Sequence, residues 1–511
     1  MRLWFKIGLT VGMLFPLLTH AQYFNNRYPI DSSSAATAFN AIENDSGYLM
    51  VGGYAPFGYY SSLALIQTDF NGNVLFQKTY KSNSVPYFAG FQGSLQKVSS
   101  GGYAMYGSLN EISESKNYAL LYRFNDVGDT LWTKRFADTS TTYGYVGDNM
   151  KVTSDGGFIC IGDRGSPSTP ISIIKTDSLG NQQWEKFYGG TTYDKPTSVA
   201  VCSDGGYIYT SATKSGGVGL PKDNIRIMKV DSLGNMVFNK FFGGVYDDNA
   251  WSILQTQDGG YLFGGNFTFL DTSCNCQKAN PYVIKLDSLG DTLWTRKYGE
   301  AMSNATVLNM YELTDGNIIL CGISRKEQIT GGDYQIQGLV FKIAANGDSL
   351  FYRLYRLLSS SSSHELRDIR PTTDGGFICS GIIYPAFPDT GTQDMWLLKL
   401  DSLGCADTVC ALATAVEEVE WEVPFGDLGA FNLYPNPNQG TFTLLYSTQE
   451  KENTYLNIID FTGKTVLQQT LLPKQGKETI TMTYFPSGIY FVRISSKEGK
   501  LLYTSKLSIV K

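Results

Sequence analysis

Short apolar runs separated by polar turns recur along most of the chain, and each run has the length of a β-strand. In the copy that begins at Asp204, the turn Asp-Gly-Gly is followed by apolar runs at 207–211 and 224–231. A second turn, Ser-Leu-Gly-Asn at 232–235, precedes a further run at 236–242. A repeat of about 49 to 59 residues predicts a propeller, a solenoid or another array. The copies begin at Asp45, Ser100, Asp155, Asp204, Asp258, Asp315 and Asp374.

Each copy is expected to form four antiparallel strands, because its turns suit tight hairpins. In the copy above we expect the first strand at 197–201, ahead of the three apolar runs. Asp-Gly-Gly supplies residues that accept a positive φ, as tight hairpins require. A further glycine lies seven residues after most copy starts, and Ser211 replaces it in one copy. Glycine within a strand indicates a close approach of two backbones, which we expect where blades crowd around an axis.

The two ends of the repeat region divide one copy between them. The seventh copy stops after its third strand, near Gly404, and Tyr23–Tyr28 matches the fourth-strand segment 237–242 in its pattern. The N-terminal segment can therefore complete the last blade of a ring, and ring closure protects strand edges. We predict an all-β fold: a seven-bladed β-propeller over residues 22–410, closed by the N-terminal strand and followed by a small C-terminal β-sandwich.

The composition agrees with an all-β protein. The 511 residues include 54 glycines, and 14% are aromatic and 17% charged. Such a composition suits many short strands joined by glycine turns. The formal net charge is -6 at pH 7. This acidic balance disfavours nonspecific nucleic-acid binding, which depends on a basic surface. We therefore expect no nucleic-acid partner, and no motif indicates a cofactor.

Residues 1–21 have the features of a signal peptide. A basic start with Arg2 and Lys6 precedes an apolar core at 7–18, and small residues follow before Gln22. The apolar core is too short to anchor the protein in a bilayer. We expect the protein to be exported.

Eight cysteines follow, in a compartment where disulfides form. Cys405 and Cys410 flank a short loop after the last copy and are the predicted disulfide. Cys274 and Cys276 share one loop but are too close for an easy bridge. Cysteines inside strands, such as Cys160, are expected to be small buried residues.

A basic residue recurs two positions before the second turn in most copies. It could line a basic funnel, or it could pair with the aspartate two residues later, on the same face of the strand. We favour the ion pair, because a functional site is built once whereas these residues occur in nearly every copy. They are Lys175, Lys229, Lys285, Lys342 and Lys399, with Arg123 in the second copy.

The segment 175–184, which ends in Trp184, resembles the tryptophan-docking repeat of quinoprotein dehydrogenases and related propellers. The same spacing leads to Trp132 and Trp294, and phenylalanine takes the position in other copies. The resemblance implies a structural role. Those enzymes place adjacent cysteines beside the quinone, and no two cysteines are adjacent here, so we expect no quinone chemistry.

Candidate catalytic groups are few. Beyond residue 22 the chain has one histidine, His364, beside a serine-rich run, and we expect it to be solvated. A single histidine disfavours histidine-cluster metal sites and histidine-dependent triads, so we expect no metal site. Asp194 and Asp248 occupy matching positions of adjacent copies, and Asp247 adjoins Asp248. Two carboxylates on separate strands can hydrolyse glycosides.

The segment 431–511 follows an acidic linker at 411–430 and shows about seven short alternating runs, typical of a small β-sandwich. Its motifs are Leu-Tyr-Pro-Asn-Pro-Asn-Gln-Gly-Thr-Phe at 433–442, Gly-Ile-Tyr-Phe-Val-Arg-Ile at 488–494 and the terminal Lys-Leu-Ser-Ile-Val-Lys at 506–511. Together they resemble the type A C-terminal sorting domain of the type IX secretion system. The resemblance implies Sec passage, recognition by the type IX machinery and export to the surface or medium. The repeats similarly resemble Asp-Gly-Gly-Tyr propeller repeats of such proteins, which carry no assigned activity.

The loops of the predicted propeller suggest where a ligand binds. Turns on one face are short and repetitive, whereas connections on the opposite face, the variable-loop face, are long and differ in every copy. Variable loops on a rigid scaffold concentrate function, and tyrosine rings suit sugar faces or protein hot spots. We expect a secreted or surface binding scaffold for a glycan or protein without catalysis; the alternatives are a carbohydrate-active enzyme and a structural surface protein. Candidate binding residues are Tyr59, Tyr60, Tyr87, Tyr145, Tyr193, Asp194, Tyr246, Asp248, Tyr334 and Tyr384.

Overall fold

A computed structural model gives the fold of most of the chain. The predicted signal peptide and linker lie outside the described residues, as do Tyr59, Tyr60, Tyr145 and Tyr193. The structure describes residues 23–32, 34–55, 61–80, 86–90, 92–136, 146–163, 170–189, 194–214, 223–244, 246–271, 276–299, 303–327, 334–406, 431–434, 440–447, 452–460, 463–472 and 475–509.

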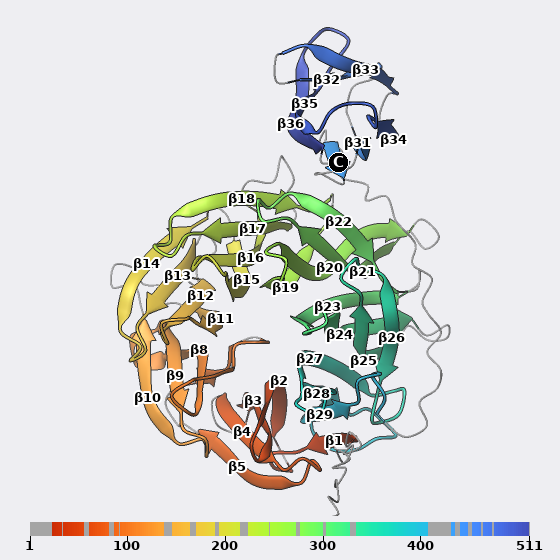
Figure 1. The fold of residues 1–511 in the computed structure, drawn as a ribbon. Helices are drawn as coiled ribbons and strands as arrows, with labels where there is room; N and C mark the ends of the chain where they lie inside the picture. Colours follow the sequence, from red (N-terminus) through yellow and green to blue (C-terminus); the bar gives the residue numbers. More distant parts are fainter. Residues whose placement is uncertain are drawn as a thin grey trace, which may run out of the picture.

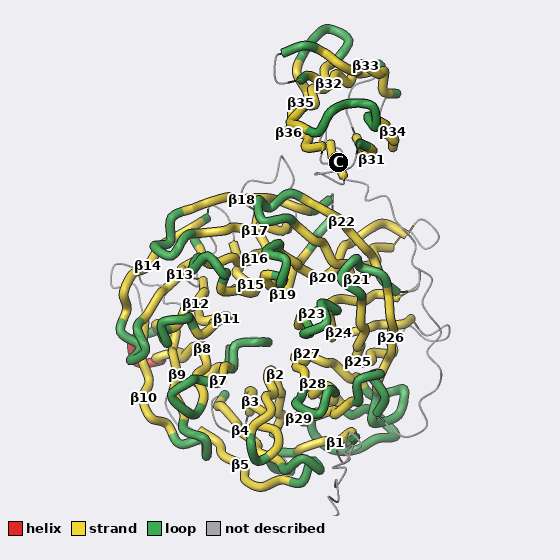
Figure 2. The backbone as a smooth tube through the Cα atoms, in the orientation of Figure 1, coloured by secondary structure: helices red, strands yellow, loops and turns green. Residues whose placement is uncertain are grey.

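Seven antiparallel sheets surround a central axis within the described residues, which confirms the predicted propeller (Figures 1 and 2). The first strand of each blade lies nearest the axis and the fourth lies at the rim. Blade 1 comprises β2 (Ala35–Asn44), β3 (Gly47–Ala55), β4 (Ser62–Thr68) and β5 (Val74–Tyr80). Blade 2 comprises β6 (Tyr87–Phe88), β7 (Gln96–Lys97), β8 (Tyr103–Glu111), β9 (Lys116–Phe124) and β10 (Thr130–Phe136). Blade 3 comprises β11 (Val146–Val152), β12 (Phe158–Asp163), β13 (Ile171–Thr176) and β14 (Gln182–Tyr188). Blades 4 and 5 comprise β15 (Asp194–Val201), β16 (Tyr207–Thr213), β17 (Asn224–Val230), β18 (Met236–Phe242); and β19 (Asn249–Gln255), β20 (Tyr261–Asp271), β21 (Cys276–Leu286), β22 (Thr292–Lys297). Blades 6 and 7 comprise β23 (Ser303–Glu312), β24 (Ile318–Glu327), β25 (Tyr334–Ile343), β26 (Ser349–Tyr355); and β27 (Ser363–Pro371), β28 (Phe377–Tyr384), β29 (Asp394–Leu400) with β1 (Phe24–Tyr28).

The N-terminal strand closes the ring, as predicted. β1 pairs antiparallel with β29, from Phe24 opposite Lys399 to Tyr28 opposite Met395. The Arg27 side chain forms an ion pair with Asp394, whose carboxylate is fully buried. The rim strand of blade 7 therefore comes from the opposite end of the propeller sequence.

Neighbouring blades meet where a turn glycine of one blade lies against an aromatic ring of the blade before it. A Cβ added to Gly180 would lie 2.7 Å from Trp132, so the turn needs a residue without a side chain. This glycine also has a φ of 76°, which favours glycine. We call this arrangement the inter-blade contact. Its members are Gly128 with Phe76, Gly180 with Trp132, Gly234 with Trp184, Gly290 with Phe238, Gly347 with Trp294, Gly404 with Phe351 and Gly72 with Phe24.

A tyrosine hydroxyl completes many of these contacts. Tyr298 donates a hydrogen bond to the carbonyl of Gly347 at 2.7 Å, and Tyr28 donates to the carbonyl of Gly72 at 2.7 Å. β1 thus supplies both the ring, Phe24, and the hydroxyl, Tyr28, for the contact between blades 7 and 1. The same hydroxyl bond joins Tyr80 to Gly128, Tyr188 to Gly234 and Tyr355 to Gly404.

The recurrent lysine forms a structural ion pair, but its partner differs from the expected one. Lys229 Nζ lies 2.9 Å from Asp204, in the Asp-Gly-Gly turn, rather than pairing with Asp231 two residues later. The pairing of β16 with β17 brings this turn beside the lysine. The corresponding pairs are Lys175 with Asp155, Lys285 with Asp258, Lys342 with Asp315 and Lys399 with Asp374.

Two blades replace this ion pair with other polar pairs at the same place. In blade 2, Arg123 donates to the hydroxyl of Ser100, which stands where other blades have the turn aspartate. In blade 1, the side-chain amides of Gln67 and Asn44 bond to each other at 2.7 and 3.1 Å. The turn is therefore tied to the third strand in every variant described here.

The ion pairs link stability to pH. Burial would raise the pKa of Asp155, but hydrogen bonds from Lys175, Thr153 and the Gly157 amide outweigh it and lower that pKa to about 2. The pKa of Asp204 is lowered in the same way. A carboxylate with a lowered folded-state pKa stabilises the fold above its unfolded pKa of about 4 and loses that contribution as the pH falls.

The C-terminal residues form two small sheets that share one hydrophobic core. β30 (Phe431–Tyr434), β31 (Thr441–Ser447) and β34 (Gln475–Thr481) form one sheet, and β33 (Thr465–Leu471), β32 (Thr454–Ile459), β35 (Gly488–Ser495) and β36 (Leu501–Ile509) form the other. Leu444 from the first sheet packs in one cluster with Ile458 and Val492 from the second. Among the described residues, no helix has the length and apolar character needed to cross a membrane.

His364 lies in an environment different from the predicted one. His364 is fully buried against Trp396 and its Nε2 accepts a hydrogen bond from the Leu358 amide, so the expectation of a solvated histidine is wrong. Burial lowers its pKa to about 4.

Cys405 is disulfide-bonded and so is Cys276. Pairing of Cys405 with Cys410 stays a prediction, because Cys410 lies outside the described residues. Cys160 is free and buried.

Removing residues 22–30 should lower the unfolding midpoint sharply. Burial of Phe24 and Tyr28 contributes about 2 kcal/mol each, and their loss also exposes the edge of β29. Thermal unfolding followed by circular dichroism measures the shift. As a graded control, Tyr28→Phe keeps the ring but removes the hydroxyl that donates to Gly72 and accepts from Asn26, and should cost only about 1 to 2 kcal/mol. An unchanged midpoint in the truncated protein would falsify closure by β1.

Asp204→Ala should destabilise the protein more than Lys229→Met. The Lys229 side chain is 2% exposed, so the first change leaves a buried ammonium without its carboxylate, at a cost on the order of 3 kcal/mol. The Asp204 side chain is 62% exposed, so after the second change its carboxylate stays hydrated. Denaturant unfolding of both variants at pH 7 gives the two costs. Equal costs would contradict the asymmetry.

Candidate functional site

Six of the described blades carry a bulge in the strand nearest the axis. The register shifts between Ala250 and Ser252 in blade 5, so Trp251 is an extra residue, and the same shift marks Leu308 in blade 6. A bulge re-aims a side chain and is common beside functional sites. The bulged residues are Phe39, Asp148, Thr197, Trp251, Leu308 and Arg367.

The repeat glycine lies opposite the bulge. A Cβ on Gly265 would lie 1.8 Å from the Asn249 carbonyl, and one on Gly322 would lie 1.9 Å from the Thr306 carbonyl. The predicted close backbone approach is therefore present, but it lies within a blade, against the bulged strand, rather than between blades near the axis. The glycines give the bulged strand room in most blades, whereas in blade 4 Ser211 stands opposite the strand that carries the Thr197 bulge.

A segment of blade 2, residues 92–95, enters the middle of the ring, where Figure 2 shows the loop beside β7. We call it the axial segment. Asn149 donates to the Gln92 carbonyl at 2.8 Å and Lys151 donates to the Gly93 carbonyl at 2.9 Å. The Leu95 amide donates to Asn40 and its carbonyl accepts from Arg370. Blades 1, 3 and 7 therefore hold the backbone of this segment.

One cavity on the variable-loop face, the larger of the two that concern us, has a volume of about 740 Å³ and is lined by blades 1 to 3, with Lys195 and Gln393. Its lining includes Ala35 at the start of β2 and Ala55 at the end of β3, which places it on that face. Four aromatic residues and several neutral polar residues form the wall. They are Phe39, Tyr54, Tyr87, Phe88, Asn110, Asn117 and Gln393.

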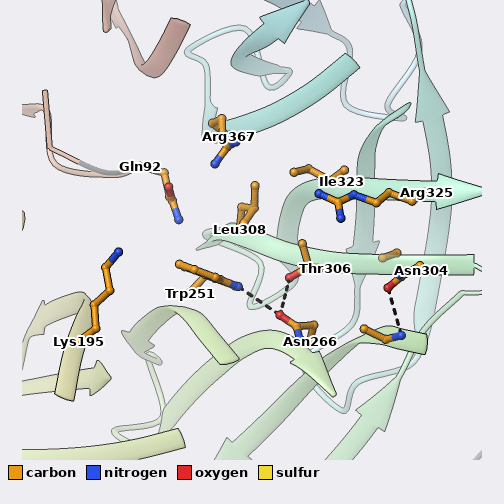
Figure 3. Close-up of a pocket in the computed structure, with 12 residues that line it drawn as sticks. Gln92, Lys195, Trp251, Asn266, Asn304, Thr306, Leu308, Ile323, Arg325 and Arg367 are labelled. Atoms are coloured by element: carbon orange, nitrogen blue, oxygen red, sulfur yellow. Dashed lines mark hydrogen bonds between the residues drawn. The ribbon is translucent and has the colours of Figure 1, made fainter. Parts of the chain in front are cut away.

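The smaller cavity has a volume of about 330 Å³ and is lined mainly by blades 5 to 7 (Figure 3). Trp251 Nε1 donates to Asn266 Oδ1 at 3.3 Å, and the Thr306 hydroxyl donates to the same oxygen at 3.3 Å. Lys195 lines both cavities, so they adjoin at β15. The charged residues of its wall are Lys195, Arg325 and Arg367.

Asp148 is a buried acid in the wall of the larger cavity. Its side chain is fully buried, and neither carboxylate oxygen has a hydrogen-bond partner among the described residues. Burial raises its pKa well above the ordinary value; the nearby Asp163 raises it further and Lys195 opposes the shift. The shift favours the protonated form of Asp148, whose two carboxyl oxygens have no hydrogen-bond partner among the described residues.

The structure brings one predicted tyrosine into this site. Among the described residues, Tyr87 lines the larger cavity, whereas Tyr246 and Tyr384 line neither cavity. Tyr334 begins β25, and its side chain lies outside the described part. Sequence reasoning missed the bulged residues, although their place upstream of the repeat glycine could have identified them.

Asp194 and Asp248 are held by hydrogen bonds within the fold. Asp248 accepts hydrogen bonds from the amides of Gly244 at 2.6 Å and Thr268 at 2.7 Å, and burial raises its pKa to about 7. Asp194 accepts a hydrogen bond from the Thr213 hydroxyl. Both side chains are fully buried, both already accept hydrogen bonds from the fold, and neither lines the two cavities described above. No group of three His, Cys, Asp or Glu residues in the described part could hold a metal ion.

Comparison with known families identifies the C-terminal segment. Residues 432–510 match the family model for the secretion system C-terminal sorting domain. This match confirms the predicted sorting domain, which implies recognition by the type IX machinery and export across the outer membrane to the surface or medium. No curated protein matches the chain.

Similar solved structures are distant. A protein of unknown function from Dyadobacter fermentans is 10% identical, with 61% of this chain and 94% of that chain covered and a TM-score of 0.39. Cobalt-substituted ACO from Synechocystis is 13% identical, with 78% and 96% covered and a TM-score of 0.41. At these scores nothing is transferred from either protein.

Asp148→Asn should stabilise the protein at neutral pH but not near pH 3.5. Because the folded-state pKa of Asp148 is raised, the wild type loses stability as the pH rises above the unfolded value of about 4. Asparagine stays neutral and avoids that loss. The difference in unfolding midpoint between variant and wild type should therefore grow with pH. A difference that is the same at every pH would show that Asp148 ionises normally.

Proposed function

We propose that this exported protein binds a ligand through the two cavities on its variable-loop face and has no catalytic activity of its own. The observation that supports this proposal most directly is the pair of adjoining cavities, whose walls combine aromatic rings with neutral hydrogen-bonding groups. Ligand sites in proteins are concave and mostly apolar, with a few polar groups that orient the ligand. The rigid ring fixes the geometry of these walls before a ligand arrives.

A glycan suits these walls better than a protein partner. Phe39, Tyr87 and Phe88 offer ring faces to the apolar side of a sugar, and Asn110 and Asn117 can bond its hydroxyls. A protein partner would need a broader patch, since stable interfaces bury about 800 Å² on each side. We therefore place a glycan in the cavities, with the protein displayed at the cell surface or released.

One observation favours a carbohydrate-active enzyme as the second candidate. Asp148 and Asp163 line the same cavity, and the pKa of Asp148 is raised by burial, as in a general acid. Glycosidases use two carboxyl groups across the scissile bond. Incubating a bound oligosaccharide with the wild type and with Asp163→Asn, followed by product analysis, separates the two candidates, since only an enzyme gives cleavage that the substitution abolishes.

Screening the secreted protein against glycan and protein panels should identify a ligand whose binding depends on the larger cavity. Tyr87→Ala and Phe88→Ala should each weaken it by about 1 to 2 kcal/mol, because each removes a ring from the wall. Calorimetry measures the affinities. Matched controls are Ser178→Ala and Ser232→Ala in the short turns, which should bind normally. Loss of binding from the short-turn variants alone would overturn the assignment.

A further inference from the structure

The smaller cavity has a cationic wall in an acidic protein. Lys195 from blade 4, Arg325 from blade 6 and Arg367 from blade 7 line it, and no acidic residue appears among the described residues of its lining. The whole chain has a net charge of -6. Figure 3 shows these side chains approaching the same space from different elements. Three separate blades thus contribute positive charge to one small volume.

Two of these cations, Arg325 and Arg367, are not fully used by the fold. Arg325 is exposed and makes no ion pair within the described part of the chain. Arg367 pairs with Glu365 through one terminal nitrogen, while its Nε is buried without a hydrogen-bond acceptor. Lys195 also faces Asp148 and Asp163 in the larger cavity, so its charge is shared. Arg325 therefore has the most charge available for a ligand, and Arg367 has an unused donor.

The neutral part of the wall suits a sugar ring. Trp251 is held through Asn266 by the bond described above, so its ring has a fixed position beside Thr306 and Leu308 (Figure 3). Gln92 of the axial segment adds a side-chain oxygen that is buried and without a hydrogen-bond partner. An aromatic ring beside amides and hydroxyls can hold the apolar face and the hydroxyls of a sugar together.

We infer that the smaller cavity is a subsite for a sugar ring bearing a carboxylate or sulfate group, so that the protein selects acidic glycans. Guanidinium groups bind such anions through paired, charge-assisted hydrogen bonds. An acidic peptide would be held mainly along its backbone, at a strand edge or in a long groove, whereas this wall offers a ring and neutral amides. The inference rests on the proposed function and specifies the class of glycan.

Calorimetry on the full secreted protein with four probes tests it: a trigalacturonate, a sulfated galactan oligosaccharide, neutral galactotriose and a polyglutamate peptide. At least one acidic sugar should bind about tenfold or more tightly than galactotriose. This affinity should fall as NaCl rises from about 50 to about 500 mM, because salt screens charge pairs. The two acidic probes distinguish carboxylate from sulfate as the recognised group.

Arg325→Gln should weaken binding of the acidic sugar by about tenfold and leave the unfolding midpoint unchanged, since Arg325 is exposed. Lys240→Gln is the matched control: it removes a cation at the rim, where Lys240 pairs with Asp291, and should bind normally. Equal binding of acidic and neutral sugars, an unchanged affinity in Arg325→Gln, a preference for polyglutamate, or no binding of either acidic sugar would each overturn the inference. The proposed function fails separately, if variants of neither cavity change the binding of any ligand found in the screen.

Discussion

The inter-blade contact is the constraint on which the ring depends. Each turn glycine has a positive φ and lies against an aromatic ring of the neighbouring blade, where an added Cβ would crowd that ring or the side chains beside it. The contact recurs at all seven boundaries between neighbouring blades. The boundary between blades 7 and 1 receives its ring and its hydroxyl from Phe24 and Tyr28.

Most of this fold could be predicted from the sequence because its determinants repeat. The turn glycines, the aromatic position at Trp184 and the match of Tyr23–Tyr28 to a fourth strand gave the blades and their closure. Prediction failed where a partner lies on another strand or loop. Lys229 reaches the turn at Asp204 through sheet pairing, which spacing along one strand cannot reveal. His364 is buried because its ring packs against Trp396 of another strand and accepts a hydrogen bond from the Leu358 amide.

The candidate site was less predictable, for a physical reason. Long variable loops pointed to the face that carries the two cavities described above, and Tyr87 lines the larger of them; that a ligand binds on this face stays a prediction. Trp251, Arg367 and Asp148 are each the extra residue of a bulge in the strand nearest the axis. No residue type is characteristic of such a bulge, so composition does not reveal its position. Its trace is the glycine that accommodates it on the paired strand. The axial segment was not predicted because it occurs in one blade and therefore leaves no repeated pattern in the sequence.

Ring closure also sets an order of assembly. β1 is the first propeller strand to leave any channel that passes the chain from its N-terminus, and its partner β29 is the last. Pairing of residues so far apart in sequence is slow, because the loop between them must be ordered first. Until then β1 can pack only against blade 1, through Phe24 and Tyr28, and has no strand to pair with, while blade 7 has an open rim. A chain stopped before β29 emerges would keep an aromatic strand at one end with nothing to pair with, which exposes it to aggregation until synthesis or transport is complete.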